Sequence, residues 1–190
     1  MFKSLFSKYM TAFMLIILIS FAILAAVISG SVRSYTIEQR ERTMIQTAKA
    51  AELYLRQTFY ESGVGDFSQF IYYSSGDAAG YLTLLTDYPS DTTIFISNAA
   101  GDILLTDLNS HVSAGEAISS VVVEDILDGN SRQQNKLGGL FDDCHITYAK
   151  TIESGNDILG IVYISASSAK LNLLADNLVK TIIMTFLWIS

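Results

Sequence analysis

The run Phe141-Asp142-Asp143-Cys144-His145 brings two acids, a thiol and an imidazole together in one short segment. These residue types suggest a metal site or a Cys–His nucleophile. Because successive residues of a strand point to opposite faces, their side chains would diverge rather than converge on one ion or one substrate. The other histidine, His111, falls in a predicted loop and is interpreted as an exposed residue. We therefore expect no metal site, and we find no catalytic motif in the chain.

A small-ligand site is the better interpretation of the polar residues in this half of the chain. Arg132 is the only arginine after Arg56, and its guanidinium could bind a carboxylate through two parallel hydrogen bonds. Asp142 could hold an amine. We predict Arg132, Asp142, His145 and Tyr148 as ligand-binding residues, with His145 and Tyr148 on opposite faces of one strand. The alternatives are that Arg132 is a solvated strand end and that Tyr148 belongs to the core.

Five strand-like segments must position these residues. The run TTIFIS at 92–97 is rich in β-branched and aromatic residues, and the turn residues of 98–102 separate it from ILLTD at 103–107. Three further runs follow at 131–137, 144–152 and 159–165, with a turn at 153–157 between the last two. This pattern predicts an antiparallel sheet.

Helices are predicted around the sheet. A long amphipathic helix over 32–60 carries an apolar stripe that is broken at Glu41, and Gly63 and Gly65 end this helix. Asp66 or Ser68 would cap a short helix, 75–77 would form a loop, and a second short helix would run to Pro89. Ser113 and Glu116 match a capping box, which predicts a helix ended by Gly129. A last helix begins near Ser168. The fold class is α+β, with the helices grouped on one side of the sheet.

The first part of the chain resembles a membrane anchor. No charged residue occurs from Tyr9 to Val32, and about 20 helical residues span about 30 Å, the thickness of the hydrocarbon core of a bilayer. A cleaved signal peptide is the rival interpretation, but its apolar core is normally shorter. Lys3 and Lys8 precede the span, which favours a cytoplasmic N-terminus. We assign 1–8 to a cytoplasmic tail, 9–29 to a transmembrane helix and 30–178 to an extracytoplasmic domain.

The last residues, KTIIMTFLWIS, contain no charge after Lys180. We expect residues 179–190 to be the start of a second transmembrane helix, truncated in the sequence. All 19 acidic residues follow the first span, and the overall net charge is −7. Such an acidic domain argues against a nucleic-acid partner. The single cysteine, Cys144, excludes an internal disulfide.

Two runs carry a resemblance to a known family. TIFISNAAGDILLTD is similar to the paired central strands of PAS-like Cache domains, and ITYAKTIESGNDILGIVYISASS is similar to their final hairpin and return helix. With the apolar opening segment, the chain resembles the extracytoplasmic sensor region of a bacterial two-component sensor histidine kinase. A proline that such families often have near Thr151 is absent.

The resemblance implies a single Cache-type domain between two transmembrane helices of the bacterial cell membrane. It places the ligand pocket between the sheet and the helices and loops that cover one of its faces. It further implies that a HAMP linker, a phosphoacceptor-histidine helix and an ATP-binding domain would follow Ser190. ATP, Mg²⁺ and the response regulator would be partners of that later region, so we expect no cofactor in these residues.

We therefore expect a signal-sensing input module that transmits the binding of a small molecule or peptide, or the state of the envelope, through its transmembrane helices. A homodimer that pairs through the membrane-proximal helices is also expected. One alternative is the sensor region of a chemoreceptor or of a cyclic-dinucleotide enzyme. Another is a signal-anchored surface protein with a structural or adhesive role.

Overall fold

The computed structural model describes residues 2–86, 92–155 and 157–189. The chain divides into two compact units, residues 40–171 and residues 1–39 together with 172–190. The sheet and the predicted ligand-binding residues all lie in the unit 40–171. Pro89, which the sequence predicts to end a helix, lies outside the described residues.

The first helix, α1, runs without interruption from Phe2 to Ser62. Its second half buries one stripe of apolar side chains, which recur every three or four residues: Met44, Ala48, Ala51, Leu55 and Phe59. The helix ends at Gly63, where a φ of +67° suits glycine. The predicted helix over 32–60 and its buried stripe are confirmed.

The apolar first half of α1 is exposed, with Phe13, Ile16 and Ile23 among its solvent-facing side chains. By length and composition, the helix from Ser7 to Ser62 is able to cross a membrane. A signal sequence near an N-terminus meets the same two criteria. The return helix α4 spans Ser168–Ile189 as predicted. Among the described residues no second helix meets the criteria for a span, so the span at 179–190 stays a prediction.

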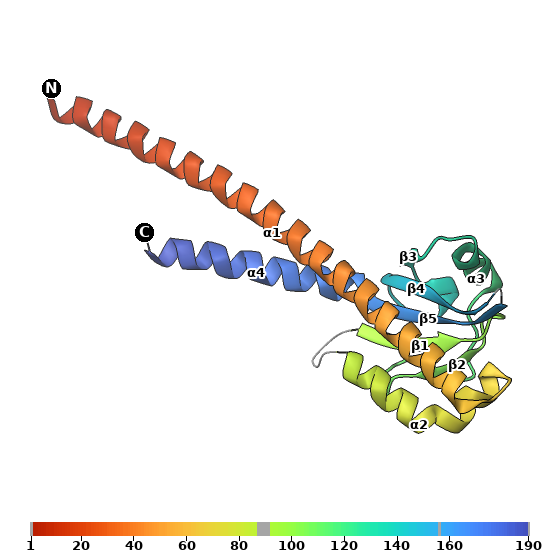
Figure 1. Cartoon of the computed structure of the whole chain (residues 1–190). Coiled ribbons are helices and arrows are strands. Elements are labelled where there is room, and N and C mark those ends of the chain that lie inside the picture. The colour runs from red at the N-terminus through yellow and green to blue at the C-terminus, as the bar shows by residue number, and fades with distance from the viewer. Residues whose placement is uncertain (1, 87–91, 156, 190) are drawn as a thin grey trace. The chain divides into compact units, whose positions relative to one another are not determined.

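Five antiparallel strands form one sheet in the order β2-β1-β5-β4-β3 (Figure 1). The strands are β1 (Thr92–Ser97), β2 (Ile103–Thr106), β3 (Arg132–Asn135), β4 (His145–Ser154) and β5 (Asp157–Ser167). All five lie where the sequence predicts them. The predicted α+β class with a long N-terminal helix and a five-stranded antiparallel sheet is confirmed.

Both faces of the sheet are buried, because the central strand β5 is apolar on both sides. Val162, Ile164 and Ala166 pack into a core with α1 and with the second helix, α2 (Phe67–Leu85). Ile161 and Tyr163 pack into a second core on the opposite face. The second core also contains α3 (Ser120–Leu127) and the loops around it. The expectation that the helices would group on one side was therefore wrong.

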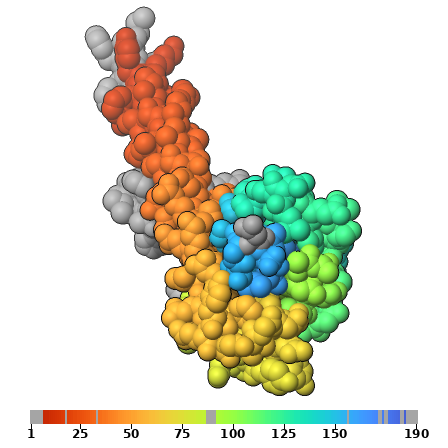
Figure 2. All heavy atoms as spheres, turned by 45° about the vertical axis from the view of Figure 1, so that its right-hand side comes forward, coloured from red at the N-terminus to blue at the C-terminus, as the bar shows by residue number. Residues whose placement is uncertain are grey.

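In the core that α1 and α2 share with the sheet, these two helices lie side by side (Figure 2). The helix α2 runs from Phe67 to Leu85, and the side chain of Asp66 caps it by accepting a hydrogen bond from Gln69 N at 2.8 Å. The expected loop at 75–77 was wrong. The buried residues Phe67, Phe70, Ile71, Ala78 and Leu82 continue one helical period through this segment, so tertiary packing outweighs the cost of Gly76.

The segment before α3 also differs from the prediction, which placed a helix start at Ser113. Ser113 N does donate to Glu116 Oε2 at 3.1 Å, but this bond closes a turn rather than opening a helix. Ile103 N donates to Glu116 O (2.8 Å), and Ile118 N donates to Gly101 O (2.9 Å). These bonds hold the segment against β2, so α3 begins only at Ser120. Gly129 follows its end with a φ of +106°, as the sequence predicts.

The continuity of α2 can be tested at Gly76. A Cβ added there would meet no atom within 4 Å, so Gly76→Ala should raise the free energy of unfolding by about 0.5–1 kcal/mol. Gly138→Ala is the matched control and should lower the free energy of unfolding by more than about 1 kcal/mol. Gly138 has a φ of +70°, and a Cβ added there would lie 2.6 Å from Ser119 Cβ. Urea unfolding followed by circular dichroism measures both. Destabilisation by Gly76→Ala would contradict a continuous helix.

Candidate functional site

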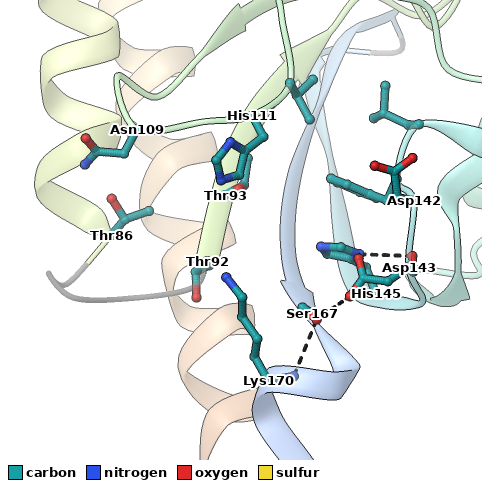
Figure 3. A pocket seen from close by; sticks show the side chains of 13 residues that line it. Thr86, Thr92, Thr93, Asn109, His111, Asp142, Asp143, His145, Ser167 and Lys170 are labelled. Atoms are coloured by element: carbon teal, nitrogen blue, oxygen red, sulfur yellow. Dashed lines mark hydrogen bonds and ion pairs between the residues drawn. The ribbon is translucent and has the colours of Figure 1, made fainter.

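A polar pocket of about 330 Å³ lies at the end of the sheet where β5 passes into α4 (Figure 3). Five segments of the chain meet there: the end of α2, the start of β1, the loop after β2, the segment before β4, and the junction of β5 with α4. The lining residues are Thr86, Thr92, Thr93, Asn109, His111, Val112, Leu140, Phe141, Asp142, Asp143, His145, Ser167 and Lys170.

Asp107 holds the loop that brings Asn109 and His111 to the pocket. It follows β2, is almost fully buried, and its carboxylate accepts hydrogen bonds from Ile94 N (2.6 Å) and Asn109 N (2.8 Å). Asp107 N donates in turn to Ile94 O (2.9 Å). Burial raises the pKa of Asp107, although both backbone donors and nearby His111 oppose this shift. The Asp107 carboxylate therefore links β1 to the loop through these hydrogen bonds.

A second loop, residues 136–143, is fixed at two points. Leu137 is fully buried despite a φ of +47°, so burial of its side chain offsets an unfavourable backbone conformation. At the other end, Asp143 Oδ2 accepts a hydrogen bond from Ser167 Oγ (2.5 Å), and Asp143 Oδ1 lies 3.2 Å from His145 Nδ1. The bond from Ser167 is the main reason why the pKa of Asp143 is lowered. The Asp143 carboxylate thus contacts two other residues of the pocket wall, Ser167 and His145.

His145 is held by an aromatic contact as well. Its ring stacks on Phe141, with ring centroids 3.9 Å apart and an interplanar angle of 16°. One face of the imidazole therefore contacts the Phe141 ring, and its Nδ1 lies near the Asp143 carboxylate. Lys170 extends from the first turn of α4 towards Thr92, and its backbone N donates to Ser167 Oγ at 3.4 Å (Figure 3). The pocket contains both acidic and basic groups, which suits a small ligand that carries charges of both signs.

The structure separates the four predicted ligand-binding residues into two pairs. Asp142 and His145 line the pocket. Arg132 and Tyr148 lie together on the other face of the sheet, where Arg132 Nη2 donates to Glu41 Oε1 (2.8 Å) and Arg132 Nε donates to Tyr148 OH (3.2 Å). His145 and Tyr148 do lie on opposite faces. Ligand binding by any of the four stays a prediction.

The pocket also contains residues that sequence reasoning missed, above all Lys170 and His111. His111 is exposed as expected, but it lines the pocket. Lys170 lies in the first turn of the return helix, and no local pattern marks it as a site residue. The position of His111, in the loop that follows the edge strand β2, is the one signal that could have found it. Among the described residues, no three His, Cys, Asp or Glu side chains are grouped to hold a metal ion.

Comparison with known proteins shows the fold. No family model matches the sequence, and no curated protein matches it. Solved structures of the ligand-binding domain of the Campylobacter jejuni chemoreceptor Tlp3 are similar. The complex with L-norvaline has a TM-score of 0.59 and 17% identity over 77% of this chain and 58% of that chain. The complex with L-valine has a TM-score of 0.53 and 16% identity over 77% and 60%, respectively.

A third structure, of the sensory domain of the Campylobacter jejuni chemoreceptor Tlp3 (CcmL), has a TM-score of 0.54 and 18% identity over 75% of this chain. This chain covers only 59% of that domain. The chain therefore spans less than two thirds of the length of these sensory domains. At this identity the likeness establishes a shared fold, that of a chemoreceptor sensory domain.

The role of Asp143 can be tested by pH. Its pKa is lowered in the folded protein, so its stabilising contribution is present above the unfolded value of 3.8 and is lost as pH falls through the folded pKa. Asp143→Asn should reduce the loss of stability as pH falls below 3.8, whereas Asp142→Asn should leave this loss in place, because Asp142 is not the acceptor for Ser167. Urea midpoints across this range measure the effect. Equal pH profiles for the two variants would refute the assignment.

Proposed function

We propose that this chain is the extracytoplasmic signal-sensing input module of a bacterial transmembrane receptor. In this proposal α1 anchors the module with its N-terminus in the cytoplasm, and residues 30–178 lie outside the membrane. The second anchor would begin at residues 179–190. The exposed apolar first half of α1 and its uninterrupted passage into the sensor domain support the arrangement.

One observation carries the proposal: the polar pocket includes the first turn of α4, the helix that leads to the expected second span. A ligand that contacts Lys170 and Ser167 would therefore touch the base of that helix. A ligand can shift a conformational equilibrium only through a difference in affinity for the two states. In this proposal, a ligand that binds one conformation more tightly than the other would bias the position of α4 through its contacts with Ser167 and Lys170.

The ligand in this proposal is a small polar molecule, and an amino acid is the favoured class. The Tlp3 domains of the same fold have been solved with L-valine, L-norvaline and isoleucine. The pocket here offers Lys170 for a carboxylate and Asp142 for an ammonium group. Its size suits a ligand at the small end of the range for protein pockets.

Specific observations favour two output classes for the receptor. The resemblance of the anchor and sensor sequence favours a two-component sensor histidine kinase, whose ATP-binding and phosphoacceptor regions would follow Ser190 and act on a response regulator. The likeness to Tlp3 sensory domains favours a chemoreceptor equally well. Exposed Ile45 and Leu53 on α1 support pairing with α1 of a second copy in either case.

Ligand binding can be measured on the full chain in nanodiscs. We expect L-valine or L-norvaline to raise the thermal unfolding temperature, because a ligand at a hundredfold excess over Kd stabilises by about 2.7 kcal/mol. Lys170→Met and Asp142→Asn should abolish the shift. Lys150→Met, an exposed lysine of β4 outside the pocket, is the matched control and should retain it. The same shift in all three variants would place the binding site elsewhere.

The class of output is tested by reading the genomic sequence after Ser190. The kinase proposal predicts the rest of a transmembrane helix, a HAMP linker, a helix with a phosphoacceptor histidine and an ATP-binding domain. A long helical signalling region without an ATP-binding domain would identify a chemoreceptor instead. A stop codon directly after Ser190 would rule out both proposals in their present form.

A further inference from the structure

The pocket shares a wall with a second, smaller cavity. Thr86 and Thr92 line both cavities. The smaller cavity has a volume of about 30 Å³ and is otherwise lined by Leu85 and by residues of α1, namely Arg40, Thr43, Met44 and Thr47. Arg40 is not among the residues that line the pocket itself. The two threonines thus stand between the Arg40 guanidinium and the space for a ligand.

The hydrogen bonds of these two threonines give them opposite roles towards the pocket. Arg40 Nη2 donates to Thr92 Oγ1 at 3.1 Å. Arginine has no acceptor, so the Thr92 hydroxyl must accept here, and its own proton is available to an acceptor on the pocket side. Thr86 Oγ1 instead donates its proton to Thr83 O at 2.8 Å. Thr86 can therefore offer only lone pairs to a ligand.

Charge reinforces the donor role of Thr92. Arg40 is half-buried with its guanidinium against the Thr92 hydroxyl, and its Nε is buried with no hydrogen-bond partner among the residues that the structure describes. A charge that is shielded from water acts more strongly on its neighbours than one in bulk solvent. Lys170 adds a second positive group on the same side of the pocket (Figure 3). A negatively charged acceptor is thus favoured at Thr92.

We propose that Arg40 is a positioning residue for this pocket, which fixes Thr92 as the hydrogen-bond donor to a ligand carboxylate and links that wall to α1. The inference rests on the proposed function, since it deepens the description of the same ligand site. The carboxylate lies at Thr92 and Lys170, and the ammonium group of the ligand points towards Asp142, on the other side of the pocket (Figure 3). Because Arg40 belongs to α1, a ligand bound at Thr92 also affects the anchoring helix through the hydrogen bond between Arg40 and Thr92.

The test is a double-mutant cycle on the full chain in nanodiscs, with L-valine affinity measured by calorimetry. Thr92→Val and Arg40→Met should each weaken binding about five- to tenfold, the loss expected for one hydrogen bond. Thr92→Ser, which keeps the hydroxyl, should bind as the wild type does. In the Thr92→Val background, Arg40→Met should cause no further loss, because Arg40 acts through Thr92.

Two controls separate this role from a general structural one. Isobutylamine, which is valine without its carboxylate, should bind equally to the wild type and to Arg40→Met. Arg56→Met removes another arginine of α1, which pairs with Glu52 at 3.4 Å and does not line the pocket. This variant should leave L-valine affinity unchanged. If Arg40→Met does not fold, the comparison of Thr92→Val with Thr92→Ser decides the donor role.

Several results would overturn the inference. Unchanged L-valine affinity in Arg40→Met, or an equal loss with Thr92 present and with Thr92→Val, would show that Arg40 does not act through Thr92. In both cases binding to the wild type still stands, so the proposed function survives. If neither L-valine nor acetate nor succinate binds the wild-type chain, the carboxylate site is refuted and the inference with it.

Discussion

The central strand β5 has no face that water can reach. From Gly160 to Ser167 every residue is buried, and its neighbours β1 and β4 pair with it along most of that length. A strand of this kind is stable only when layers cover both sides of the sheet. Gly160 shows how close the covering is, because a Cβ there would lie 2.5 Å from Ser97 O and 2.9 Å from Phe67 Cε1. The other elements of the domain are arranged so that both faces of the sheet are covered.

The layers that cover the two faces of the sheet are built from different elements, and the pocket forms because of this difference. On one face, α1 and α2 supply continuous stripes of large apolar side chains. On the other, a short helix and several loops do the covering, and their apolar residues extend only part of the way along the sheet. Where Val112, Leu140 and Phe141 end this core, polar side chains from the same loops take over. The carboxylates of Asp107 and Asp143 hold these two loops through their hydrogen bonds.

Sequence reasoning succeeded where the signal was local and periodic. The stripe from Met44 to Phe59 and the strands at 92–97 and 159–165 follow from spacing and residue type alone. It failed where a local signal competed with tertiary contacts. Gly76 suggested a break that the packing of α2 overrides, and Ser113 with Glu116 suggested a helix start that pairing with β2 prevents. The pocket was only half predictable, since Asp142 and His145 share a short run, whereas Lys170 and His111 meet them only through long-range folding.

The central claim is that a small polar ligand binds at the base of α4 and that α1 responds through Arg40. Amide hydrogen exchange of the full chain in nanodiscs, with and without L-valine, tests it most directly. The account predicts slower exchange at 92–94, 109–112, 141–145 and 167–171, together with slower exchange in α1 around Arg40, and no change in α2 near Tyr72. Slower exchange confined to other segments, or ligand protection of the pocket without any change around Arg40, would contradict the account.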